Sequence, residues 1–75
     1  MSALRKRSIH LRGQKTSVSL EDEFWDALKE ISAAKGERVP DTINAIDQSR
    51  PDRLNLSSAI RLFVLRHFRP HRAAQ

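Results

Sequence analysis

The chain has 75 residues, no cysteine and a formal net charge of +5. A chain of this length forms at most one domain and buries only roughly 60% of its unfolded surface on folding, so an isolated protomer would be marginally stable. The lack of cysteine excludes disulfides and thiolate metal sites, which leaves a partner chain as the expected source of additional stability.

The charges are segregated along the sequence. Residues 1–15 hold five bases and no acid, residues 16–49 hold three bases and eight acids, and residues 50–75 hold six bases and one acid. Two basic ends therefore flank an acidic middle. This distribution favours a polyanionic partner, nucleic acid first and an anionic membrane surface second; the simpler alternative is that the basic ends only keep the protein in solution.

The N-terminal segment is basic, but no apolar run follows it that could serve as a secretory signal or a membrane span. We therefore expect a soluble, intracellular protein with no membrane partner. Residues 1–7 lack apolar periodicity and are predicted to form a flexible basic arm ahead of a domain over residues 8–69.

Residues 8–20 alternate polar and aliphatic side chains. A type II′ turn at Gly13 and Gln14 would place Ile9 opposite Val18 in a hairpin. One face would then hold Ile9, Leu11, Val18 and Leu20, and the other His10, Arg12, Lys15, Ser17 and Ser19. The alternative is a disordered arm followed by a single strand over residues 15–20, because Gly-Gln is a weaker turn signal than Asn-Gly.

Three helices are predicted after the strand. The first spans residues 22–35 and begins with acidic residues, which the helix dipole favours. A short second helix spans residues 40–49, with Pro40 at its start and Pro51 beyond its end. The third spans residues 56–68, is capped by Asn55 or Ser57 and ends before Pro70; residues 70–75 are predicted to fray.

The third helix is apolar nearly all round, with Arg61, Arg66 and His67 as its clearly polar positions. Such a helix must be covered on more than one side. In so small a protein, a second subunit is the expected cover.

No arrangement of residues predicts catalysis. The sequence has no glycine-rich phosphate loop, no cysteine nucleophile and no recognisable serine–histidine pairing. His67 and His71 have the spacing of a helical metal pair, but Pro70 lies between them and no third ligand is near. We expect no catalytic residue, no metal and no cofactor.

Three segments, KTSVSL, EDEFWDALKEI and LSSAIRLFVLRHF, follow one another as strand, acidic helix start and apolar helix. In this order they resemble the ribbon-helix-helix family of bacterial DNA-binding proteins (MetJ/Arc/CopG type), in particular a subgroup with an insertion between the two core helices. The resemblance covers residues 15–35 and 55–68. It implies a mainly α, intertwined homodimer that inserts an antiparallel β-ribbon into the DNA major groove as a transcriptional repressor or autoregulator, in the cytoplasm at the nucleoid.

The resemblance also implies roles for particular residues. Base contacts would come from the outer face of the strand, namely Lys15, Ser17 and Ser19. Phosphate contacts would come from the basic arm and the start of the last helix: Arg5, Lys6, Arg7, Arg12, Asn55, Ser57 and Ser58. The dimer core would contain Val18, Leu20, Trp25, Leu28, Ile60, Phe63 and Val64.

Two features depart from the family pattern. A hairpin in each protomer would give the dimer a four-stranded sheet, which is too wide for the major groove. The insertion over residues 37–54 could displace the last helix, and its acids Glu37, Asp41 and Asp47 would repel DNA if they faced it. The alternative function is a dimeric protein-interaction module, an adaptor or antitoxin-like protein whose basic ends bind an acidic partner such as a toxin.

Overall fold

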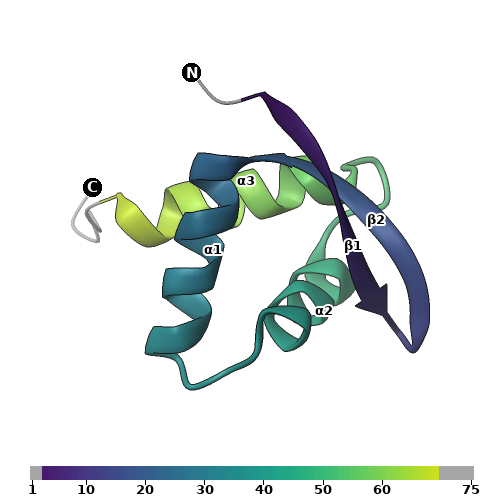
Figure 1. Ribbon diagram of the computed structural model, residues 1–75, viewed down its shortest axis with the longest axis horizontal. Coiled ribbons are helices and arrows are strands. Elements are labelled where there is room, and N and C mark those ends of the chain that lie inside the picture. The colour runs from purple at the N-terminus through teal and green to yellow at the C-terminus, as the bar shows by residue number, and fades with distance from the viewer. Residues whose placement is uncertain (1–2, 70–75) are drawn as a thin grey trace.

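The computed structural model describes residues 3–69 as a two-stranded antiparallel hairpin followed by three helices (Figure 1). The elements are β1 (Leu4–Leu11), β2 (Gln14–Glu21), α1 (Asp22–Ala34), α2 (Val39–Ser49) and α3 (Leu56–Phe68). The observed helix bounds differ from the predicted ones by at most one residue. The first two residues of the predicted arm and the predicted frayed tail over residues 70–75 lie outside the described residues.

The strand β1 begins at Leu4, so residues 4–7, which we predicted as a flexible arm, belong to the hairpin instead. Contacts with α1 account for this difference. The Arg7 guanidinium binds the Asp22 carboxylate at the start of α1 and lies 5.0 Å from the centroid of the Trp25 ring. Arg5 forms a second ion pair with Asp22 at 3.3 Å. Because these partners come from a later helix, the local pattern of basic residues did not reveal the strand.

The hairpin turn is formed by Arg12 and Gly13, whose φ angles are 53° and 79°. Positive φ at both central residues is the requirement of a type I′ turn, so the predicted type II′ turn at Gly13 and Gln14 is wrong. In the observed register Ile9 pairs with Thr16, and Val18 pairs with Arg7. The shift preserves the alternation of the side chains, so the strand residues remain on their predicted faces. Arg12 does not, because it lies in the turn and its side chain bonds to Asp47 of α2.

The inner face of the hairpin packs against the helices and closes a core to which all five elements contribute. The buried hydrophobic residues are Ile9, Val18, Leu20, Leu28, Ile31, Ile43, Ile46, Ala59, Ile60 and Val64. Ile43 and Ile46 come from α2, so the inserted segment completes this core. The buried Ser32 hydroxyl is satisfied by the Leu28 carbonyl at 2.9 Å and by Thr42 Oγ1 at 2.8 Å, which joins α1 to α2.

Most residues that we predicted for the core of a dimer are buried within the single chain. Val18, Leu20, Leu28, Ile60 and Val64 are buried, while Trp25 and Phe63 are half-buried against the same core. The burial of this set therefore does not require a second chain. The α3 side chains that remain outside it include Leu65 and Phe68, which are 47% and 57% exposed. Within residues 3–69, no helix combines the length and apolar character needed to cross a membrane.

Candidate nucleic-acid interface

The outer face of the hairpin carries a row of polar side chains arranged as cross-strand pairs. The pairs are Lys6 with Ser19, Ser8 with Ser17, and His10 with Lys15. All six are exposed except Ser19, which is half-buried. Since side chains alternate along a strand, these six project from the face opposite the helices. Their hydroxyl and imidazole groups can donate to or accept from base edges, and the lysine ammonium groups can donate to them.

Three of these residues, Lys15, Ser17 and Ser19, are the base contacts implied by the family resemblance, and β2 brings them onto one face. The facing residues of β1 extend the set. Lys6 was assigned to phosphate, while Ser8 and His10 were not assigned to DNA. The alternation of polar and aliphatic residues over 8–12 could have indicated that Ser8 and His10 lie on the outer face. That inference holds only if the hairpin forms, and the sequence left the hairpin as one of two alternatives.

All three hairpin arginines that we predicted for phosphate form ion pairs within the chain; Arg5 pairs with Asp22 at 3.3 Å but remains 67% exposed. Arg7 is bound to Asp22 and stacked near Trp25, and its side chain is only 17% exposed. A phosphate could reach this guanidinium only by breaking both contacts, so the predicted role does not fit its placement. Arg12 is bound to Asp47 at 2.8 Å but remains 68% exposed.

The helix α2 holds the hairpin turn through two polar side chains. Asn44 Oδ1 accepts the Arg12 backbone N–H at 2.9 Å, and Asn44 Nδ2 donates to the His10 carbonyl at 3.2 Å. One turn later, Asp47 accepts from the Arg12 guanidinium and from Arg50 Nε at 2.7 Å. These hydrogen bonds fix Arg12, the non-glycine residue with positive φ, and the end of β1 beside it.

Asp47 is one of the acids that could have repelled DNA, but its side chain is only 2% exposed. The hydrogen bond from Arg50 is the main cause that lowers the pKa of Asp47, and Arg12 lowers it further, against burial, which raises it. The charge is therefore neutralised inside the protein. Glu37 is likewise occupied, since it accepts from the Thr42 hydroxyl at 2.8 Å.

The N-terminus of α3 lies against the end of β2 despite the insertion. The Ser57 hydroxyl donates to the Ser19 carbonyl at 2.7 Å, and Asn55 Oδ1 caps the helix by accepting the Ser58 N–H at 2.8 Å. Of the three residues predicted for phosphate here, Asn55 and Ser57 thus use their side chains within the chain, and Ser58 uses its backbone N–H. A phosphate at this position would meet the remaining backbone N–H groups of the first turn, where the helix dipole favours an anion.

An ion pair also joins the end of β2 to α3. The Arg61 guanidinium lies 3.0 Å from Glu21 Oε1, and this hydrogen bond is the main cause that lowers the pKa of Glu21. Together with the bond from Ser57, it fixes α3 relative to the hairpin at two points.

Comparison with known families agrees with this architecture. A model of the ribbon-helix-helix domain matches residues 4–68. The chain therefore belongs to the ribbon-helix-helix family, whose members are DNA-binding regulators that dimerise and are not catalytic. No curated protein and no solved structure matches the chain. Among the described residues, no group of three or more histidine, aspartate or glutamate side chains could hold a metal ion.

Proposed function

We propose that this protein binds double-stranded DNA through the outer face of its hairpin and acts as a transcriptional repressor or autoregulator. The observation that carries the proposal is the two-stranded ribbon with six outward polar side chains. Two strands about 4.8 Å apart fit a major groove about 12 Å wide, whereas four strands do not. Both strands come from one chain here, so a single hairpin is sufficient to fill the groove.

The residues we assign to base edges are Lys15, Ser17 and Ser19, joined by Lys6, Ser8 and His10. Lysine can donate to the guanine acceptors, while serine donates or accepts and so distinguishes bases less sharply than arginine or asparagine. We expect a modest sequence preference for each half-site. Phosphates would be held by Arg5 and by the backbone at the start of α3, and the exposed Arg12 would add attraction near the turn.

We further propose that the protein works as a homodimer that pairs through α3. Leu65 and Phe68 are exposed on this helix, and family members dimerise in general. Two copies related by a two-fold axis would present two hairpins, so the operator should contain two related half-sites.

The test is a selection of random duplex DNA by the purified protein at about physiological salt, where nonspecific attraction is weak. The selected duplex is then titrated with the double variant Ser17→Ala/Ser19→Ala. We expect an enriched site with two-fold symmetry and an affinity loss of roughly tenfold or more in the variant. The variant keeps the bond from Ser57, because that bond uses the Ser19 carbonyl.

The control is Ser49→Ala, which removes a hydroxyl that bonds only to the backbone of its own helix. It should leave the affinity for the selected duplex unchanged. If no site is enriched and binding disappears as salt rises, the basic residues act only as charge and the readout by the hairpin is refuted. If the double variant loses its fold, the serines support the sheet and the assignment of base contacts fails.

A further inference from the structure

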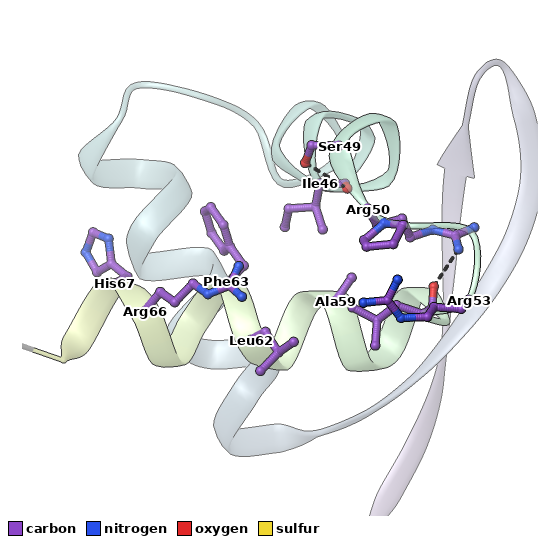
Figure 2. Close-up of a pocket in the computed structure, with 11 residues that line it drawn as sticks. Ile46, Ser49, Arg50, Arg53, Ala59, Leu62, Phe63, Arg66 and His67 are labelled. Atoms are coloured by element: carbon purple, nitrogen blue, oxygen red, sulfur yellow. Dashed lines mark hydrogen bonds between the residues drawn. The ribbon is translucent and has the colours of Figure 1, made fainter.

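A groove of about 630 Å³ lies between α2 and α3, on the helical side of the molecule (Figure 2). It is lined by α2, the loop that follows it and α3: Ile46, Ser49, Arg50, Pro51, Arg53, Leu54, Ala59, Leu62, Phe63, Arg66 and His67. No strand residue lines it. A duplex bound to the outer face of the hairpin would therefore leave this groove open.

The groove combines an apolar floor with cationic ends. Ile46 and Phe63 face each other across it, while Arg53 lies at one end and Arg66 and His67 lie at the other (Figure 2). Among residues 3–69, none that lines it is acidic. The Lys35 ammonium lies 5.6 Å from the centroid of the Phe63 ring and adds a further positive charge beside the floor.

We propose that this groove binds an acidic amphipathic helix of a partner protein. Such a helix would place apolar side chains on the floor and carboxylates at both ends, a recurrent mode of peptide recognition. A fatty acid has one charged end and would leave one group of cations without a partner. The stretch from Ala59 to His67 corresponds to roughly 12 Å of helix, so the occupant needs about two to three turns in contact.

The arginines that line the groove differ in whether they are free to bind a partner's carboxylates. Arg50 is largely used within the chain, because it binds Asp47 and donates to the Leu54 carbonyl at 2.6 Å. Arg53 and Arg66 are exposed. These two arginines are therefore the residues that would recognise the carboxylates.

A second copy of this chain is a poor occupant on grounds of charge and shape. The exposed apolar residues of α3, Leu65 and Phe68, have Arg66 and Arg69 as neighbours and would bring like charge to the cationic ends. The helix α1 is acidic, but it exposes no large hydrophobic side chain that could fill the floor. A partner helix with apolar and acidic side chains on one face would both cover the apolar floor and pair with the cations at the ends.

The probes are two synthetic helices of roughly 14 residues. They share the same leucine stripe and carry either glutamate or lysine at the flanking positions. Binding to the whole protein is measured by fluorescence anisotropy at about physiological salt. We expect the glutamate peptide to bind, the lysine peptide not to bind, and the variant Arg53→Glu/Arg66→Glu to lose affinity for the glutamate peptide by roughly tenfold or more.

The matched control is Lys29→Glu/Arg38→Glu, which changes the net charge equally at exposed positions outside the groove. It should retain the affinity of the unchanged protein. Equal binding of both peptides, or an equal loss in the control, would overturn the proposal. A change in self-association of Arg53→Glu alone, measured by sedimentation, would also overturn it, because Arg53 lines the groove from the loop before α3 and the groove would then be an interface between copies.

Discussion

The Asp47 carboxylate on α2 lies 2.8 Å from the Arg12 guanidinium at the hairpin turn, 35 residues away in the sequence. The carboxylate is almost completely buried, whereas the arginine side chain is mostly exposed. This pair therefore connects the interior of the protein to the tip of the surface that we propose reads DNA. Through this ion pair, the inserted helix α2 supports that surface. The contribution of the pair to the free energy of unfolding can be measured.

Replacement of Asp47 by asparagine should destabilise the fold. The variant loses two charge-assisted hydrogen bonds and leaves Arg50 without its buried partner, which should lower the free energy of unfolding by about 2 kcal/mol. Urea unfolding followed by the fluorescence of Trp25 measures this. Asp41→Asn is the control, because Asp41 is exposed and its contact with Arg38 is 4.0 Å long, so its effect should stay within about 0.5 kcal/mol.

The same carboxylate predicts a dependence of stability on pH. Its pKa is lowered in the folded protein, so its contribution is fully present above the unfolded value of about 3.9 and is lost as the pH falls through the folded value. The difference in unfolding free energy between the unchanged protein and Asp47→Asn should therefore be constant near neutral pH and shrink below about pH 4. A difference that stays constant down to pH 2 would contradict the assignment.

Two replacements of Asn55 separate its capping role from the proposed phosphate site. Asn55→Ala removes the cap of α3 and should cost about 1 kcal/mol of stability. Asn55→Asp keeps the cap, so stability should be retained, but its charge should weaken DNA binding if a phosphate lies at the start of α3. Urea unfolding and DNA titration on both variants test this. Unchanged DNA affinity in Asn55→Asp would place the phosphate elsewhere.

The proposed dimer contact is tested by Leu65→Glu. Leu65 is exposed on α3, so the charge should leave the fold of each protomer intact while it disrupts an apolar interface between copies. Sedimentation should show a shift from dimer to monomer, with an unchanged circular dichroism spectrum. Ala33→Glu introduces the same charge at an exposed position on α1 and should remain dimeric. If both variants sediment like the unchanged protein, α3 does not form the interface.

The sequence was sufficient to predict the helices and the two faces of the hairpin, because both depend on local periodicity. It was not sufficient to predict the turn. Arg12 adopts a positive φ, which a non-glycine residue rarely adopts, and its backbone and side chain are held there by Asn44 and Asp47. Those partners lie on a helix far along the chain, so no local pattern could show them.

The candidate site was also predictable only in the parts that depend on local sequence. The alternation around Ser17 indicated a polar outer face, and the serine-rich start of the last helix indicated a cap. The engagement of Arg7 by Asp22 was not predictable, because a basic residue near the N-terminus has no sequence signal that separates a free charge from an ion pair within the fold. The groove between α2 and α3 was also missed, since it depends on how the two helices cross.

The hairpin also determines what the protein would retain on dilution. Both strands of the ribbon belong to one polypeptide, and residues 6–19 contain the six polar side chains that we propose contact DNA bases. A separated protomer would keep its complete reading surface. On this arrangement, a second subunit would contribute avidity by raising the effective concentration of the other hairpin near its half-site, and would not create the recognition itself.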